Sequence, residues 1–329
     1  MITRKLAPAI MMGSPCVLKP SELTPLIAIA LEQLAIEANF PPNTFRLILA
    51  SKEKTPEVGK LLAVDSRVPK ISFTGSTEVG KLLLKMSADS EIVKRVSLEL
   101  GGNAAFIVCA SADIDAAVEG AMVSKFRNAG QTCVCSDRFL VHESVLEEFS
   151  EKLVSRASEL KIADGHDSDC EMACLISEHA VTRTDSRVKR ALATGCELLT
   201  GGERMPDLGP HFFQPTILTN VNIDDDIWRL ENFAPLVAIK SFSNIEEALE
   251  IANNTNTGLC NYFYTNDEGE KAKMIDELES GMIGVNSGIV SSALAPFGGT
   301  KGSGIGREGS EEGWSSYVET KYVRVAILE

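Results

Sequence analysis

Residues 70–87 read Lys-Ile-Ser-Phe-Thr-Gly-Ser-Thr-Glu-Val-Gly-Lys-Leu-Leu-Leu-Lys-Met-Ser. The pattern predicts a short apolar strand over Lys70–Phe73, a glycine turn, and an amphipathic helix over Thr77–Ser87. A helix that starts directly after a strand presents free backbone amides to a phosphate group. The segment also looks like the phosphate loop of nucleotide triphosphatases. Leu82 stands where that loop needs a hydroxyl for magnesium, so this class is excluded.

The same rhythm of strand and helix continues on both sides of this segment. It predicts strands at 17–18, 45–49 and 95–98 and helices at 26–38 and 56–65. Short apolar strands separated by helices imply right-handed crossovers and a parallel sheet of the dinucleotide-binding type. A second series starts at Ala104, with strands at 106–109 and 138–141 and helices at 114–127 and 146–160. We therefore expect an α/β protein with a domain junction near Gly101-Gly102.

Composition excludes several classes of protein. The 329 residues are enough for two domains, and a net charge of −14 argues against a nucleic-acid partner. The longest apolar run, 25–36, contains Glu32 and is too short to span a membrane, so we expect no membrane partner. The 8 cysteines lack the density of a small disulfide-bonded domain and indicate reduced, intracellular thiols.

His166, Cys170 and Cys174 are spaced by four residues, so a helix there could place them on one face as metal ligands. The segment around them reads as a loop and offers no fourth ligand, so we expect no metal.

Residues 128–135 read Asn-Ala-Gly-Gln-Thr-Cys-Val-Cys, and Glu99-Leu-Gly-Gly-Asn lies upstream. A thiol that acts as a nucleophile needs an open backbone around it and a base elsewhere in the fold. Cys133 taken alone would more often be a buried structural cysteine. A carboxylate such as Glu99 at the end of an apolar strand is costly unless it has a partner or a chemical role.

Together these two segments resemble the aldehyde dehydrogenase superfamily, and the resemblance covers the whole chain. It implies an aldehyde dehydrogenase-like α/β fold: a Rossmann-type parallel sheet, incomplete here, an α/β catalytic domain and a β oligomerisation tail. The implied regions are a partial NAD-binding domain at 1–101, a catalytic domain at 102–298, and a late loop with an oligomerisation strand at 299–329. It also implies Cys133 as nucleophile, Glu99 as general base, and a homo-oligomer such as a tetramer.

The resemblance implies NAD as cofactor. The matching positions are Lys19, Pro20, Ser21, Glu22, Gly75, Ser76, Gly80, Glu231 and Phe233. The carboxylate of Glu22 would accept a bond from a ribose 2′-hydroxyl and repel a 2′-phosphate, which predicts NAD over NADP. Ala234 replaces the usual glycine, and because its methyl group disfavours a positive φ we expect altered cofactor geometry there. Gly304–Gly309 formally matches G-x-G-x-x-G but follows no predicted strand, so it is not read as a cofactor fingerprint.

Within the superfamily, several segments are similar to succinate-semialdehyde dehydrogenase. In that subfamily two arginines and a serine hold the distal carboxylate of the substrate, and the matching positions are Arg4, Arg127 and Ser291. Guanidinium groups suit this role because they bind carboxylates bidentately. Cys135 matches a redox partner that locks Cys133 in a disulfide; the alternative is a core cysteine with no regulatory role.

Other positions depart from the family or match it weakly. Lys5 and Glu308 match positions linked to proton relay, and surface charge is the other interpretation. Asp137 stands where the family usually has asparagine. In the family a P-W-N-F-P segment precedes the residues matching Met1–Arg4. We therefore expect a chain truncated at its amino terminus, without the oxyanion-binding asparagine and the first strand of the nucleotide sheet.

Two classes of function remain open from the sequence. The first is NAD-dependent oxidation of succinate semialdehyde to succinate in 4-aminobutyrate degradation, through a Cys133 thiohemiacetal and a thioester hydrolysed with Glu99 as base. The second is an inactive truncated paralogue or fragment that binds nucleotide or an intact partner subunit. A dehydrogenase for another carboxylated aldehyde is a variant of the first. The compartment, mitochondrial or cytoplasmic, is not decided.

Overall fold

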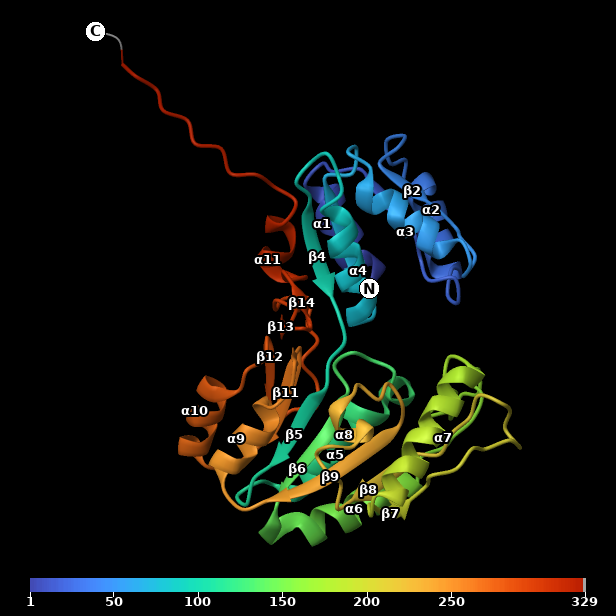
Figure 1. The fold of residues 1–329 in the computed structure, drawn as a ribbon, viewed down its shortest axis with the longest axis vertical. Coiled ribbons are helices and arrows are strands. Elements are labelled where there is room, and N and C mark those ends of the chain that lie inside the picture. The colour runs from blue at the N-terminus through green and yellow to red at the C-terminus, as the bar shows by residue number, and fades with distance from the viewer. Residues whose placement is uncertain (328–329) are drawn as a thin grey trace. The chain divides into compact units, whose positions relative to one another are not determined.

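The computed structural model describes residues 1–327 (Figure 1). The chain forms two compact units. The first comprises Met1–Glu99, Ser292–Phe297 and Ile305–Glu329, and the second comprises Leu100–Ser291 and Gly298–Gly304. The chain thus leaves the first unit directly after Glu99, close to the predicted junction at Gly101-Gly102.

The first unit alternates helices and strands as the sequence predicts. Its elements are α1 (Ile2–Met11), β1 (Cys16–Leu18), α2 (Leu26–Glu37), β2 (Phe45–Leu47), α3 (Thr55–Val64), β3 (Lys70–Thr74), α4 (Thr77–Ser87), β4 (Arg95–Glu99) and α11 (Ser310–Ser315). β1 pairs with β2 and β3 pairs with β4, both in parallel. β14 (Gly304–Ile305) lies on the other side of β4.

The second unit is built on a seven-stranded sheet with the order β12-β11-β5-β6-β9-β8-β7. Its strands are β5 (Ala104–Val108), β6 (Ser136–His142), β7 (Glu197–Thr200), β8 (Thr216–Thr219), β9 (Leu236–Phe242), β11 (Cys260–Tyr264) and β12 (Met282–Val285). Every pairing is parallel except that of the edge strand β7 with β8. Each residue of β5 is buried, which is typical of a central parallel strand.

Helices pack against this sheet (Figure 1). They are α5 (Ile114–Phe126), α6 (Leu146–Ser158), α7 (Glu178–Ala193), α8 (Asp226–Arg229), α9 (Ile245–Asn253) and α10 (Glu268–Glu277). α5 and α6 contact each other and β6, whereas α9 contacts β5 and β9. The α/β fold class expected from the sequence is confirmed.

The end of the chain differs from the single late region expected at 299–329. β13 (Thr300–Lys301) pairs with β10 (Thr257–Gly258) in the second unit, whereas β14 pairs with β4. The oligomerisation strand was expected within this region, where residues 322–328 are a β-prone run. Residues 322–327 lie in no helix or strand, and Leu328 lies outside the described residues. None of the helices in residues 1–327 is both long enough and apolar enough to cross a membrane.

Candidate active site

The segment before Cys133 makes a tight left-handed turn. α5 ends at Phe126, and Asn128, Ala129 and Gly130 follow with φ angles of 53°, 53° and 75°. Gly130 is required here because a Cβ atom at this position would overlap the carbonyl oxygen of Ala234. The turn ends the helix and presents the half-buried thiol of Cys133 at its exit. Strained backbone of this kind is common at functional sites.

The backbone around Cys133 is fixed from several sides. Gln131 accepts a hydrogen bond from the Ile176 N–H at 2.8 Å through Oε1. The carbonyl of Val134 accepts the Tyr262 hydroxyl at 2.8 Å. Gly102 lies so close that a Cβ atom there would overlap the carbonyl oxygen of Cys133. The thiol therefore sits on a loop whose position is set by packing, as a nucleophile requires.

Cys135 has a different environment from Cys133. Its side chain is only 4% exposed, and its sulfur lies 2.8 Å from the Thr132 hydroxyl. Burial raises the pKa of the Cys135 thiol, which keeps it protonated. Within residues 1–327, neither Cys133 nor Cys135 forms a disulfide.

Glu231 lies against the glycines that follow Glu99. Its Oε1 accepts the Gly102 N–H at 3.2 Å, and burial raises its pKa to about 7. Phe233 is the left-handed residue of this segment, with φ 49°, whereas Ala234 has no positive φ and is fully buried. The expectation of altered cofactor geometry assumed a positive φ at Ala234, and the structure places the positive φ one residue earlier, at Phe233.

A buried ion pair joins the Glu231 segment to the strand that follows the thiol. The side chains of Lys125 and Asp137 are 0% and 3% exposed and meet at 2.7 Å. The other carboxylate oxygen of Asp137 accepts the Asn232 N–H at 3.0 Å. Arg187 donates to the carbonyl of Glu231 at 2.6 Å and to the Asn232 side chain at 2.9 Å. Sequence reasoning missed this cluster, although a lysine on the apolar helix before Cys133 was a signal for a buried partner.

In the first unit, Glu99 ends β4 and is only 4% exposed. Burial raises the pKa of its carboxyl to about 8, and the nearby charge of Glu308 adds to the shift. Lys5 forms an ion pair with Glu308 and donates to the Thr74 hydroxyl at 2.7 Å. Since their side chains are 15% and 6% exposed, Lys5 and Glu308 are not surface charges.

The residues expected to bind the adenosine ribose lie at the carboxyl ends of β1 and β2. Pro20, Ser21 and Glu22 line a small cavity of about 210 Å³ together with Leu49–Ser51. Lys19 lies 3.4 Å from the Glu22 carboxylate. This edge of an open parallel sheet is where ligands bind in α/β proteins.

The turn at Gly75-Ser76 lies at the carboxyl end of β3. The Ser76 hydroxyl accepts the Val79 N–H at 3.3 Å and caps α4, on which Gly80 is buried. The amino end of α4 offers amides to a phosphate, and Glu22 offers an acceptor for a ribose hydroxyl. These residues fit a dinucleotide.

The expected substrate residues divide between the units. Arg127 and Ser291 belong to the second unit, and both are exposed. Arg4 belongs to the first unit, where its guanidinium lies 4.4 Å above the centre of the Phe297 ring. One buried nitrogen of Arg4 has no hydrogen-bond partner among residues 1–327. An unsatisfied guanidinium N–H is a donor that an anion would satisfy.

Residues 1–323 match the model of the aldehyde dehydrogenase family. The chain belongs to this family. It is 46% identical over 323 residues to a 3-sulfolactaldehyde dehydrogenase of Pseudomonas putida, covering 98% of this chain and 65% of that protein. It is 47% identical over 324 residues to the mitochondrial succinate-semialdehyde dehydrogenase of Rattus norvegicus, covering 98% of this chain and 61% of that protein.

A solved structure described as an NADP-dependent enzyme of E. coli superposes with a TM-score of 0.96 at 44% identity. The match covers 99% of this chain and 66% of that one. The aldehyde dehydrogenase-like fold is thereby confirmed. This family member spans 61–66% of the length of these relatives.

Proposed function

We propose that this chain carries the catalytic machinery of an NAD-dependent aldehyde dehydrogenase that oxidises succinate semialdehyde to succinate. The observation that carries the proposal is the loop of Cys133, where a left-handed turn and the hydrogen bonds that Gln131 and Val134 accept fix a half-buried thiol. Such a thiol adds to an aldehyde carbonyl and forms a thiohemiacetal. The nicotinamide, when bound, supplies the acceptor for the hydride whose loss leaves a thioester on Cys133.

Glu99 is the proposed base that activates water to hydrolyse the thioester. Glu99 precedes Gly102 by three residues, and Gly102 packs against the carbonyl of Cys133. A pKa of about 8 leaves Glu99 able to accept a proton near neutral pH.

Arg127, Arg4 and Ser291 are proposed to hold the distal anion of the substrate. Two of the similar proteins are named for aldehydes with an anionic group, a carboxylate in one and a sulfonate in the other. 3-Sulfolactaldehyde is therefore a second candidate substrate. Both substrates need cations at the end of the site away from the reacting aldehyde. A comparison of the two aldehydes therefore tests which anion the site prefers, and the reaction at the aldehyde is the same for both.

We propose that the cavity at Pro20–Glu22 binds the adenosine ribose of NAD. Gly75, Ser76 and Gly80 would contact the pyrophosphate, and Glu231 and Phe233 would contact the nicotinamide end. Glu22 is the basis for a preference for NAD over NADP, since its carboxylate would repel a 2′-phosphate. The thiols of Cys133 and Cys135 are two residues apart, and we propose that they form a reversible disulfide that inactivates the enzyme.

One assay tests these proposals. We expect the purified chain to produce NADH, read by its absorbance, from NAD and succinate semialdehyde, with NADP a poorer cofactor and diamide an inhibitor reversed by dithiothreitol. Cys133→Ala should abolish turnover, whereas the matched variant Cys135→Ala should retain it and lose only the diamide sensitivity. No NADH from any of these aldehydes would favour the alternative of a nucleotide-binding or partner-binding chain without activity.

A further inference from the structure

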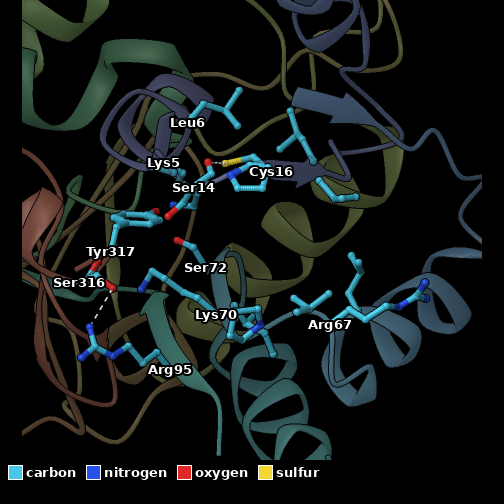
Figure 2. Close-up of a pocket in the computed structure, with 18 of the residues that line it drawn as sticks. Lys5, Leu6, Ser14, Cys16, Arg67, Lys70, Ser72, Arg95, Ser316 and Tyr317 are labelled. Carbon is cyan, nitrogen blue, oxygen red and sulfur yellow. Dashed lines mark hydrogen bonds between the residues drawn. The ribbon is translucent and has the colours of Figure 1, made fainter. Parts of the chain in front are cut away.

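Charged side chains line a cavity of about 860 Å³ in the first unit, and Figure 2 shows Arg67 and Arg95 among them. Both arginines are exposed, and they pair with Asp65 and Glu319. Water solvates charges of this kind, so their ion pairs contribute little to the fold. The second unit differs, because it contains charged side chains that are buried.

The buried charges of the second unit are Lys125 at the end of α5, Asp137 on β6 and Arg187 on α7, which are 0%, 2% and 8% exposed. Buried charges are costly unless they are paired and hydrogen-bonded. Lys125 pairs with Asp137. Arg187 forms no ion pair within residues 1–327 and donates instead to neutral oxygens of Glu231 and Asn232. The charge of Arg187 is therefore directed at the Glu231–Asn232 segment.

Glu231 and Asn232 lie in no helix or strand, so side chains hold their backbone in place of a regular ladder. Nη1 of Arg187 donates to the Glu231 carbonyl at 2.6 Å and to Oδ1 of Asn232 at 2.9 Å. Asp137 accepts the Asn232 N–H at 3.0 Å. Asn232 is 1% exposed, and buried backbone groups need such partners. Without Arg187, the Glu231 carbonyl would lose its donor, whereas Asp137 would still hold the Asn232 N–H.

The Glu231 side chain runs from this anchor to the glycines that pack against the Cys133 loop. Its Oε1 accepts the Gly102 N–H at 3.2 Å. A Cβ atom at Gly101 would lie 2.8 Å from its Oε2, and one at Gly102 would overlap the carbonyl oxygen of Cys133. A shift of the Glu231 backbone would therefore move its carboxylate away from the Gly102 N–H and from the thiol loop.

We propose that Arg187 is a positioning residue for the nicotinamide end of the cofactor, because it fixes the Glu231 carboxylate through the backbone of that residue. The inference rests on the proposed function, in which Glu231 contacts this end of NAD. A guanidinium suits the role because it stays charged when buried and donates to several acceptors at once. Since Arg187 acts through Glu231 alone, its loss should leave the adenosine site at Pro20–Glu22 unaffected.

The test measures the dissociation constants of NAD and of AMP for the full chain by isothermal titration calorimetry. AMP carries the adenosine end of NAD but lacks the nicotinamide end. Arg187→Gln removes the charged donor, so it should raise the dissociation constant of NAD about tenfold and that of AMP by less than about twofold. Arg187→Lys keeps a charged donor on a different geometry and should fall between Arg187→Gln and the unaltered chain.

Arg190→Gln is the matched control, because it changes an exposed arginine of the same helix. Arg190 pairs with Asp226 at 3.0 Å, and the two side chains are 60% and 52% exposed. Exposed ion pairs contribute little, so both dissociation constants should stay within about twofold. Hydrogen exchange is a second measurement that needs no ligand. Exchange at the Gly102 amide should be about tenfold faster in Arg187→Gln and unchanged in Arg190→Gln.

An unchanged dissociation constant of NAD in Arg187→Gln would overturn the proposal. Equal increases for NAD and AMP would also overturn it, because they would indicate a general loss of structure. If circular dichroism shows that Arg187→Gln is unfolded, Arg187→Lys decides, since the proposal requires it to bind NAD more weakly and AMP equally well.

Failure of the proposed function gives a different result. A chain that binds NAD without forming NADH from succinate semialdehyde would contradict the proposed function, while the comparison of NAD with AMP would still decide the role of Arg187. No NAD binding by the unaltered chain would overturn both.

Discussion

The buried environment of the Glu99 carboxyl sets the pH range in which this residue can act as a base. Because its pKa is raised to about 8, chiefly by burial, it is mostly protonated at pH 7 and becomes a base only as the pH rises. We therefore expect kcat for succinate semialdehyde to increase about tenfold per pH unit below about 8 and to level off above it. The measurement is a pH–rate profile at saturating NAD and aldehyde.

Glu99→Gln is the matched variant for this profile. It keeps the size of the side chain but removes the base, so thioester hydrolysis should fall roughly 10²-fold or more. A rapid first turnover of NADH should survive, because thiol addition and hydride loss do not need Glu99. A profile that still rises through pH 8 in Glu99→Gln would assign the titration to another group.

Replacing Arg127 should weaken the binding of an anionic substrate. Loss of a charge-assisted bond costs about 1.5–3 kcal/mol, so Arg127→Ala should raise KM for succinate semialdehyde roughly 10–100-fold. KM for butyraldehyde, which has no distal anion, should stay within about twofold. Arg127→Lys keeps the charge but not the bidentate geometry and should fall between the two. Equal effects on both aldehydes would remove Arg127 from the proposed clamp.

Among the elements, strand β6 and the segment at Glu231 are held together by Asp137. Asp137→Ala leaves the Lys125 ammonium buried without a partner and frees the Asn232 N–H. Breaking a buried ion pair in this way costs about 3–5 kcal/mol. We expect a loss of that order in the free energy of unfolding in urea, together with a raised KM for NAD, because Glu231 adjoins Asn232.

Two further variants separate charge from packing at this pair. Asp137→Asn keeps an acceptor but not the negative charge and should recover only part of the stability. The double variant Lys125→Met with Asp137→Asn removes the buried charge altogether. A stable Asp137→Ala variant with an unchanged KM for NAD would show that the pair does not position the Glu231 segment.

The elements predicted from the sequence are those whose signals are local. α4 spans Thr77–Ser87 as predicted, because an amphipathic repeat follows a serine cap at Ser76. β5 begins at Ala104, two residues before its predicted start, since alanine has little strand propensity and is recruited here by pairing with β6. The two-residue strands β10, β13 and β14 have no local pattern, and only distant partners define them.

The site follows the same division between local and distant signals. The motifs at Cys133, Glu99 and Glu22 were visible in the sequence because short segments carry them. The Lys125–Asp137 pair and the bond from Asp137 to Asn232 were not, because their partners meet only once β6 and the Glu231 loop are in place.

For the molecule as a whole, the tail at 322–327 is the feature that points to assembly. Tyr322, Val323, Val325 and Ile327 are 67–93% exposed, and none of them lies in a helix or strand. An extended segment of this composition gains both main-chain bonds and apolar burial by pairing with a neighbouring chain. Removing residues 321–329 should therefore lower the mass of the assembly, measured by light scattering. The double variant Val323→Lys with Val325→Lys should lower this mass too without shortening the chain. Lys321→Ala is the control and should leave the mass unchanged, and an unaltered mass in the truncated chain would refute a role for the tail in assembly.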